Sequence, residues 1–534
     1  MSEELFWADQ LADSIIKRKK FHYTDGNIKN PSTLTVKTSA SLSGVLHIGR
    51  LSDTIRSESV YKALIDADQK AKLIWVAEDM DPFRKLPKGI PKKFEEYLGM
   101  AVTDMPDPHG CHKSYAEHFK EEYLEVVHDF VSTKLEIKST REEYKKGSFK
   151  PYIKKILEHT KEIIEIQDKY RKDPLQNWSP WKPICENCGK LSTTHLTKFN
   201  EKEFHYECKD YSFESATAKG CNHKGVDDPL KGNGKLMWKS EWAAEWAMWK
   251  IVSEGAGKEY QVPGSAFWIN GEICEKILNY PEPKPIFYEH LMIDNQKMSA
   301  SLGNVVYPKE WVEVSSPEHL RLFYNKKVMK TRSFSWQDLP RIYDEFDKFA
   351  RIYNGEEPVE NKKEEAHIKR LFNISSLKSI KKPVPVAFSQ LAMVAQVFPN
   401  EKDAINILEK TGHYNKDFAK EIKERFEKAK TWLDKYVPDE QKFTIQTELP
   451  KNLDLTDKQK EALHRVAEIL KKGSYNEDSL YNEFYTICKD MELPPKDLFQ
   501  AGYKVLLDKE RGPKLASLIL AIGVDKVISL FMTI

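Results

Sequence analysis

A histidine and a glycine lie at the junction between a strand-like run and a helix-like run, in the segment GVLHIGRL that begins at Gly44. A strand that turns directly into a helix exposes backbone N–H groups and the positive end of the helix dipole, which suits a phosphate. Gly49 would let a nucleotide approach the backbone closely, and His47 could donate a hydrogen bond to a phosphate oxygen as charge develops on it. The segment predicts a nucleotide site, although a chance His-x-Gly would look the same.

A second candidate phosphate-handling segment is KMSAS at 297–301, followed by Leu-Gly-Asn-Val. It offers one cation, Lys297, two hydroxyls, Ser299 and Ser301, and a flexible Gly303. Such a loop can close on a polyphosphate and neutralise the leaving group only once it has shut. Taken alone, the segment could also be a polar turn.

Four of the seven cysteines lie between residues 185 and 221, which favours metal ligation in a reducing compartment over a disulfide scaffold. The Cys-x-x-Cys pair is a strong signal for a closed tetrahedral zinc site, and the other two cysteines are more loosely spaced. His205 or His223 could therefore replace a cysteine. The predicted ligands of this structural site, which would stabilise a region short of apolar residues, are Cys185, Cys188, Cys208 and Cys221.

The stretch DPHGCHKSYAEH holds a second mixed set of possible ligands within a dozen residues. Two of them are adjacent and could share a metal only at a turn, which Pro108 and Gly110 make plausible. Surface histidines beside a buried cysteine are the alternative, and His109 is a spare ligand. The set comprises Asp107, Cys111, His112 and His118.

The elements that must position these residues alternate in type along the N-terminal third. TLTVKTSA at 33–40 is strand-like, SDTIRSESVYKALIDA at 52–67 is helix-like, and AKLIWVAE at 71–78 is strand-like again. This β, α, β order predicts a parallel, doubly wound α/β sheet.

Beyond this sheet the pattern changes twice. Residues 105–232 read as an insertion with long charged helices such as 152–172, and sheet-like sequence returns at 283–294. Residues 356–367 look like a polar linker, after which the chain is mainly helical. One helix there has capping-box spacing at Thr456 and Gln459, followed by an apolar stripe that predicts a core helix.

Length and composition set bounds but identify no partner. A chain of 534 residues implies two to four domains, and a net charge of +2 favours no particular ligand. Basic runs such as KRKK at 17–20 are more often solvated helix faces. No stretch of 18 uninterrupted apolar residues and no signal-peptide pattern occurs, so we expect a cytoplasmic protein without a membrane partner.

In this order, and on either side of an insertion, the two phosphate-handling segments resemble the "HIGH" and "KMSKS" signatures of class I aminoacyl-tRNA synthetases. Four further stretches resemble the class I lysyl-tRNA synthetases, and the likeness spans nearly the entire chain. These stretches are EDMDPFRKLPKGIP at 78–91, PDPHGCHKSYAEHF at 106–119, NGKLMWKSEWAAEWAMW at 233–249 and ELPPKDLFQAGYKVLLDKERGPKLASLI at 492–519.

The resemblance implies an enzyme that activates lysine with ATP and Mg²⁺ and transfers it to tRNA(Lys), with one or two Zn²⁺ ions, the second at the Asp107 set. The implied catalytic residues are His47, Gly49, Lys297, Ser299 and Ser301. The implied ATP-binding residues are Gly44, His47, Gly49, Lys297, Met298 and Ser299. The implied lysine-binding residues are Ser39, Ser41, Asp79, Trp238, Tyr260 and Tyr288.

A lysine substrate needs an aromatic or apolar wall for its methylene stem, partners for its ammonium and a counter-charge for its α-groups. Trp238 and Tyr288 could form the wall, and the carboxylates at 78–81 follow a strand end, where such sheets bind ligands. The tryptophans at 242, 246 and 249 fit a buried helix stripe better.

Several positions depart from the family pattern. Ser39-Ala40-Ser41 stands where a Gly-x-Thr is expected, Arg50 replaces an asparagine, and Ser52-Asp53 replaces an Arg-Glu pair. Tyr260 stands in place of a histidine, and Ala300 removes a charge or hydroxyl from the loop. Because His47, Gly49 and Lys297 are intact, we interpret these changes as a repacked pocket in an active branch.

The expected fold is a Rossmann-like parallel-sheet catalytic domain with an inserted zinc-binding domain, followed by an all-helical anticodon-binding domain. The expected boundaries are 1–104 and 233–295 for the catalytic domain, 105–232 for the insertion, 296–354 for the loop and stem-contact region, and 355–534 for the helical domain. A glutamyl-type synthetase, an adenylate-forming paralogue and a non-catalytic zinc-containing RNA-binding protein are the alternatives.

Overall fold

The computed structural model describes residues 6–42, 44–298, 304–377 and 382–534. The chain divides into two compact units. The first comprises Met1–Val312, Ser316–Phe334 and Pro358–Ile380, and the second comprises Glu313–Ser315, Ser335–Glu357 and Lys381–Ile534. The chain therefore passes between the units several times.

The first unit is built on a five-stranded sheet in the order β12-β11-β1-β2-β3, in which every neighbouring pair is parallel. Its strands are β1 (Leu34–Ser41), β2 (Ala71–Glu78), β3 (Glu136–Ser139), β11 (Ile251–Gly257) and β12 (Lys284–Tyr288). The order reverses between β1 and β11, and ligands in such sheets bind at the carboxyl ends of the strands beside this switch point. The predicted α/β class with a parallel sheet is confirmed.

The sequence of the central strands explains their position. The run AKLIWVAE of β2 is apolar almost throughout, and Leu73 to Ala77 are buried, as expected for a strand covered on both faces. Its bounds match the predicted 71–78. Strand β1 is also buried along most of its length, and its buried residues include a charged one, Lys37.

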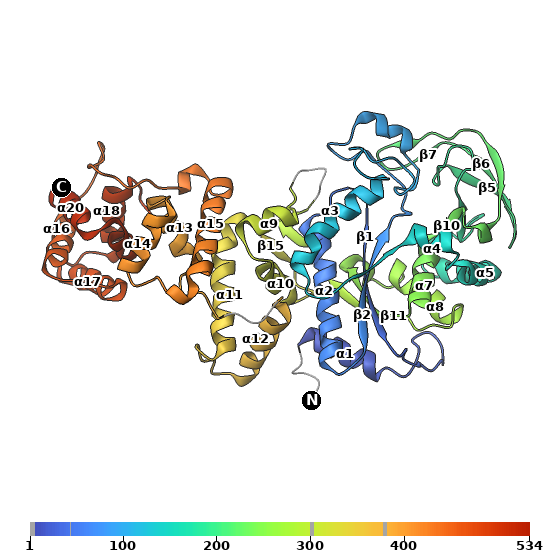
Figure 1. Cartoon of the computed structure of the whole chain (residues 1–534), viewed down its shortest axis with the longest axis horizontal. Helices are drawn as coiled ribbons and strands as arrows, with labels where there is room; N and C mark the ends of the chain where they lie inside the picture. The colour runs from blue at the N-terminus through green and yellow to red at the C-terminus, as the bar shows by residue number, and fades with distance from the viewer. Residues whose placement is uncertain (1–5, 43, 299–303, 378–381) are drawn as a thin grey trace. The chain divides into compact units, whose positions relative to one another are not determined.

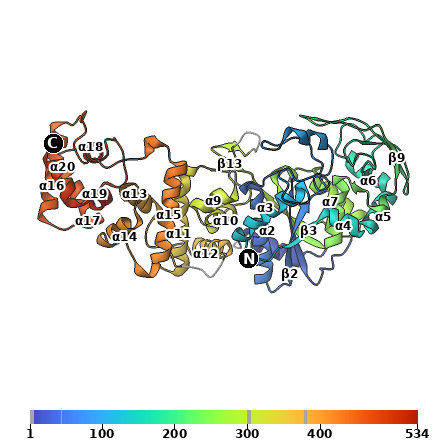
Figure 2. The same cartoon turned by 45° about the horizontal axis from the view of Figure 1, so that its top comes forward.

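Helices cover both faces of this sheet, with α2 and α3 on one side and α7 and α8 on the other (Figures 1 and 2). Helix α1 packs on α2. The bounds are α1 (Trp7–Lys17), α2 (Ile48–Asp66), α3 (Tyr115–Phe130), α7 (Trp238–Trp249) and α8 (Ala266–Lys276). Helix α2 begins four residues before the predicted start at 52, because His47 caps its first turn.

The stretch predicted as an insertion, 105–232, contains α3 and β3, so part of it completes the sheet. The remainder forms short helices and small antiparallel sheets. These are α4 (Thr140–Lys146), α5 (Lys150–Glu158), α6 (Thr160–Asp168), β4 (Trp181–Pro183), β5 (Thr194–Phe199), β6 (Phe204–Cys208), β7 (Tyr211–Ser212), β8 (Thr217–Ala218) and β9 (Lys224–Asp227), with β10 (Gly234–Leu236) pairing back to β4.

The single helix predicted over 152–172 is wrong. Helical geometry stops at His159, whose Nδ1 lies 2.8 Å from the Lys155 carbonyl oxygen, and α6 begins at Thr160. The break lets two separate apolar stripes, one containing Ile156 and the other Ile163, reach the same core.

Three further strands and three helices follow the main sheet: β13 (Leu291–Ile293), β14 (Gln296–Lys297), β15 (Arg332–Phe334), α9 (Pro308–Val314), α10 (Pro317–Asn325) and α12 (Lys362–Ser375). Helix α12 lies in the first unit, where Arg370 binds Asp9 of α1 and Asp66 of α2. The second half of the expected linker at 356–367 is therefore helical.

The described part of the second unit is helical. Its helices are α11 (Leu339–Asn354), α13 (Phe388–Val397), α14 (Glu401–Lys410), α15 (Ala419–Tyr436), α16 (Asp457–Lys472), α17 (Glu477–Asp490), α18 (Pro495–Leu507), α19 (Leu515–Ile522) and α20 (Val524–Met532). The predicted capping box is present: Gln459 N–H donates to Thr456 Oγ1 at 3.2 Å, and Thr456 N–H donates to Gln459 Oε1 at 3.0 Å. The apolar stripe of this helix is buried, as predicted.

Among the described residues, no single helix is long and apolar enough to cross a membrane. Helices α19 and α20 meet the length and hydropathy criteria only when taken together, and the chain bends by 105° between them.

Candidate active site and metal centres

His47 lies at the N-cap of α2, beyond the carboxyl end of the central strand β1. Its Nδ1 accepts a hydrogen bond from the Gly49 N–H at 3.1 Å. Burial, aided by the nearby Arg50 guanidinium, lowers the pKa of His47 to about 4. The ring is therefore neutral at pH 7, and because Nδ1 accepts, the proton resides on Nε2. Nε2–H is a donor available to a ligand above the start of the helix.

The two predicted phosphate-handling segments meet at Gly49. A Cβ atom built on Gly49 would lie 2.7 Å from Met298 Cε and 2.7 Å from His47 Cε1, so a larger residue there would displace one of these side chains. The chain that follows the loop also contacts this junction, because the Ile48 N–H donates to the Val306 carbonyl at 2.9 Å. Segments some 250 residues apart therefore converge on the first turn of α2.

The remaining residues predicted to bind ATP or to act in catalysis are Gly44, Lys297, Ser299 and Ser301. Lys297 is exposed at the end of β14, where it pairs with Met292. Gly44 has φ +150°, a conformation that residues with side chains rarely adopt. Ser299 and Ser301 lie outside the described residues.

Two aromatic side chains of the predicted lysine pocket, Trp238 and Tyr260, both contact Trp242. The rings of Trp238 and Trp242 stack with centroids 4.7 Å apart, and Tyr260 meets the edge of Trp242 at 5.3 Å. Trp242 and Trp246 are buried, which confirms the helix stripe at these positions, whereas Trp249 is only half-buried.

Tyr288 ends β12 and lies beside two buried charged residues, Asp53 and Arg56. The sequence did not assign either of them to the site. Its hydroxyl hydrogen-bonds to Asp53 of α2, and the Arg56 guanidinium lies 4.7 Å from its ring centroid. Thr38 of β1 also donates to Asp53, at 2.6 Å. Burial raises the pKa of Asp53 against the opposing effect of these hydrogen bonds. The sequence signal that could have identified this pair is an acidic and a basic residue three positions apart, shortly after the His-Ile-Gly motif.

The predicted serines lie on β1 itself. Ser39 and Ser41 are half-buried, and in the register with β2 they face Val76 and Glu78. Both are among the last three residues of β1, at the carboxyl end of the strand.

Each of the three carboxylates at the end of β2 and just after it is engaged by the protein. Asp79 accepts hydrogen bonds from the Ser139 hydroxyl at 2.5 Å, the Thr140 hydroxyl at 2.8 Å and the Arg141 N–H at 2.9 Å, which fixes the start of α4. Glu78 pairs with Lys37, and Asp81 pairs with Lys235. Asp79 thus has a structural task, and its contact with an amino-acid ligand stays a prediction.

The four cysteines of the predicted zinc site come together. Their sulfur atoms all lie within 4.8 Å of one another, with Cys185 to Cys221 and Cys188 to Cys208 both at 3.6 Å. Zn–S bonds of about 2.3 Å place tetrahedral sulfurs roughly 3.8 Å apart, whereas a disulfide requires about 2 Å. The donor set therefore fits a tetrahedral metal and not two disulfides.

The two histidines that were alternatives at this site are engaged elsewhere. His223 Nε2 lies 2.7 Å from Glu186 Oε1, and His205 Nε2 lies 3.7 Å from Glu203 Oε2. The backbone N–H of Cys221 instead points at Cys208 Sγ, at 3.3 Å, an arrangement that stabilises a thiolate.

The second candidate metal centre is also assembled. Cys111 Sγ lies 3.1 Å from His112 Nδ1 and 3.3 Å from His118 Nδ1, and Asp107 Oδ1 lies 3.4 Å from His118 Nδ1. The tight turn arises because Asp107 accepts backbone N–H groups of residues 109, 111 and 112. Although burial acts to raise the pKa of Asp107, these hydrogen bonds hold it well below its usual range. One carboxylate, one thiol and two imidazoles form a plausible four-ligand set for a divalent metal.

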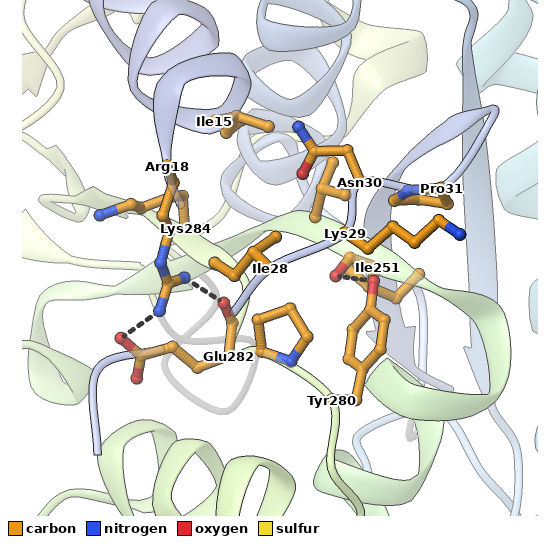
Figure 3. Close-up of a pocket in the computed structure, with 12 residues that line it drawn as sticks. Ile15, Arg18, Ile28, Lys29, Asn30, Pro31, Ile251, Tyr280, Glu282 and Lys284 are labelled. Atoms are coloured by element: carbon orange, nitrogen blue, oxygen red, sulfur yellow. Dashed lines mark hydrogen bonds and ion pairs between the residues drawn. The ribbon is translucent and has the colours of Figure 1, made fainter. Parts of the chain in front are cut away.

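A pocket lies at the other end of the strands from His47 and is lined by different residues (Figure 3). It lies at the amino-terminal ends of β11 and β12, where Arg18 donates to the Glu282 carbonyl at 2.6 Å and Tyr280 to the Ile251 carbonyl at 3.0 Å. Because parallel sheets of this kind bind ligands at the carboxyl ends of their strands, this pocket is not the candidate active site.

Comparison with known proteins gives a consistent result. The family profile described as tRNA synthetases class I (K) matches residues 5–378. The chain is similar to proteins named lysine--tRNA ligase, at 33% identity to one from Methanocaldococcus jannaschii and 30% to one from Methanosphaera stadtmanae. The alignments cover 98% of this chain in both cases, and 99% and 98% of those proteins. Among solved structures, a glutamate tRNA ligase from Elizabethkingia meningosepticum CCUG26117 aligns with TM-score 0.40 and 11% identity, over 94% of this chain and 98% of that chain.

Proposed function

Because the chain belongs to the class I lysyl-tRNA synthetases, we propose that it activates lysine with ATP to lysyl-adenylate and transfers the lysyl group to tRNA(Lys). The observation that carries this proposal is the meeting of Gly49 and Met298, since a synthetase of this class must bring the start of α2 and the loop after β14 to one triphosphate. The activity belongs in the cytoplasm, where translation consumes charged tRNA.

In the first step the lysine carboxylate attacks the α-phosphorus of ATP, and pyrophosphate leaves. His47 Nε2–H donates to a phosphate oxygen, and as a neutral donor it stabilises developing charge without transferring a proton. Gly44 leaves room for the nucleotide beside the backbone, and the missing side chain of Gly49 lets His47 and Met298 lie against the first turn of α2. Mg²⁺, when it enters with ATP, would supply further neutralisation of charge.

We propose that Lys297, Met298, Ser299 and Ser301 stabilise the departing pyrophosphate. The exposure of Lys297 suits a cation that reaches the phosphates only when the loop closes. No covalent intermediate with the enzyme is needed, because positioning and charge stabilisation carry the rate.

The lysine side chain lies against an aromatic wall, for which we propose Trp238, Tyr260 and Tyr288. The polar residues proposed to contact its charged groups are Ser39, Ser41 and Asp79. Stacking of Trp238 on Trp242, which lies outside the wall, keeps the Trp238 ring in a fixed position.

Two zinc ions would stabilise the enzyme away from the reaction. The four-cysteine site would hold Zn²⁺ as a closed structural centre, and Asp107, Cys111, His112 and His118 would hold a second one. We further propose that the region of residues 105–232 meets the acceptor end of the tRNA and that the helices of the second unit read the anticodon, a single-stranded target.

Lysine-dependent exchange of ATP and pyrophosphate, measured with each of the twenty amino acids, tests the first step. We expect exchange with lysine and none with glutamate, and glutamate-dependent exchange would replace the substrate assignment. Charging of tRNA(Lys) tests the second step, and adenylate formation without charging would reduce the chain to an adenylate-forming paralogue.

A further inference from the structure

A fully buried lysine on the central strand is surrounded by carboxylates that the proposed reaction does not use. Lys37 Nζ lies 2.6 Å from Glu245 Oε2, 2.9 Å from Glu254 Oε1 and 3.3 Å from Glu78 Oε1. Although burial acts to lower the pKa of Lys37, these carboxylates hold it well above its usual value. A buried cation with such partners is strongly fixed, because breaking a buried ion pair leaves an uncompensated charge.

Glu254 of β11 extends this cluster to helix α7. While Oε1 binds Lys37, Oε2 accepts both the Trp242 indole N–H at 2.8 Å and the Trp246 indole N–H at 2.5 Å. Both carboxylate oxygens are therefore used, and the carboxylate holds two indole rings at a defined angle to the sheet.

Trp242 in turn supports the aromatic wall. Its ring stacks on Trp238 with an interplanar angle of 21° and meets Tyr260 edge-on. Helix α7 does not fix Trp238 by itself, because Lys239 departs from helical geometry with φ −78° and ψ 22°. The position of Trp238 therefore depends on the packing surface that Trp242 presents.

We propose that Lys37 and Glu254 are positioning residues for lysine binding: Lys37 holds Glu254, and Glu254 sets the orientation of Trp242, against which Trp238 and Tyr260 pack. This inference rests on the proposed function, because the contact of the aromatic wall with lysine belongs to it. Lys37 and Glu254 are both buried and act only through the tryptophans.

The test replaces Glu254 by leucine, which removes both acceptor oxygens, and compares it with Glu254→Gln, which keeps one. In lysine-dependent ATP–pyrophosphate exchange we expect Glu254→Leu to raise the KM for lysine about ten-fold and the KM for ATP less than about two-fold. Glu254→Gln should recover most of the loss. A general loss of structure would raise both constants or lower only the amount of active enzyme.

Trp242→Phe provides an independent variant, because it keeps an aromatic ring and deletes the indole N–H that binds Glu254. It should raise the KM for lysine without raising the KM for ATP. If Glu254→Leu does not fold, this variant alone tests the positioning role. Asp347→Asn, which breaks a buried ion pair of the second unit, is the matched control and should leave the KM for lysine unchanged.

The outcomes separate the two proposals. If the unaltered enzyme shows no lysine-dependent exchange, the proposed function fails. If it does show exchange and both Glu254→Leu and Trp242→Phe keep the KM for lysine within about two-fold, or shift both KM values equally, the positioning role is overturned.

Discussion

At the residue scale, one ring nitrogen of His47 caps a helix, and we propose that the other binds ATP. Nδ1 of His47 satisfies a backbone N–H at the start of α2, which fixes both the ring and its tautomer. Nε2 is thereby left as the donor toward the ligand. Because the two contacts use different atoms of the side chain, a substitution can remove one contact and keep the other.

Replacing His47 by serine should keep the cap and remove the Nε2–H donor that we propose for the phosphate. We expect His47→Ser to unfold within a few degrees of the parent and to lower the exchange rate about 100-fold, the cost of one lost donor to developing charge. His47→Ala should lose the same activity and, in addition, about 1 kcal/mol of stability. Thermal unfolding and exchange rates measure the two effects, and equal stability of both variants would contradict the capping role.

The lowered pKa of His47 also gives a pH dependence of stability. Between pH 6.5, its ordinary pKa, and about 4, its value in the folded protein, the unfolded chain binds a proton that the folded protein does not. The contribution of His47 to the free energy of unfolding is therefore complete above pH 6.5 and falls as the pH drops toward 4. Urea unfolding at several pH values should show that the free energy of unfolding falls less steeply toward acid pH in His47→Ser than in the parent. An unchanged slope would contradict the lowered pKa of His47.

At the scale of elements, the site depends on how closely α2 lies against the sheet. Gly255 of β11 makes this approach possible, because a Cβ atom there would fall 1.8 Å from Asp53 Oδ1. Asp53 in turn binds Thr38 of β1 and Tyr288 of β12. One residue of α2 thus connects three strands at the carboxyl edge of the sheet.

Gly255→Ala should push α2 away from the sheet. We expect a loss of about 2 kcal/mol in stability, as for other overpacked cores, together with a higher KM for lysine because Tyr288 loses its support. Gly473→Ala is the matched control, since its new methyl group would meet Tyr475 at an ordinary 3.5 Å. Chemical unfolding and exchange kinetics check both variants, and a neutral Gly255→Ala would disprove the close approach.

The small antiparallel sheet of β5, β6 and β9 has little apolar core of its own. The buried cluster there consists of Cys185, Tyr206 and Cys208. If metal supplies the missing stability, then chelation should melt this sheet first. We expect the purified enzyme to contain up to two zinc ions per chain by atomic absorption, and Cys185→Ser to remove one of them together with part of the thermal stability. Metal-free protein of undiminished stability would exclude the structural role.

Sequence reasoning was most successful where pattern and chemistry are local. The strand at 71–78 and the Thr456 capping box follow from near neighbours in the sequence, and the four grouped cysteines all lie between residues 185 and 221. It was less successful where a side chain's partners come from distant segments. Lys37 sits in a strand-like run, and only the fold brings Glu245 and Glu254, over 200 residues away, to its ammonium group. The break at His159 escaped prediction because both halves have good helical spacing, and only the core decides where they bend.

At the scale of the whole molecule, each unit has a large hydrophobic core among its described residues, one around the sheet of the first unit and one among the helices of the second. The second core contains its own buried ion pair. Arg425 donates to both oxygens of Asp347, at 2.7 and 2.9 Å, and also to the Val386 carbonyl at 2.8 Å. A ligand of the first unit and a substitution in the second should therefore act on different parts of the unfolding curve.

Calorimetric unfolding of the full chain should show two transitions. The proposed function places the ATP and lysine sites in the first unit, so both ligands at 100 times their dissociation constant should stabilise that transition by about 2.7 kcal/mol and leave the other in place. Asp347→Asn leaves the Arg425 charge without its partner in the core, so it should lower only the second transition, by about 3 kcal/mol. If ligand and substitution instead moved a single transition together, the two cores would unfold as one cooperative unit, and the division of the chain into separately stabilised parts would be wrong.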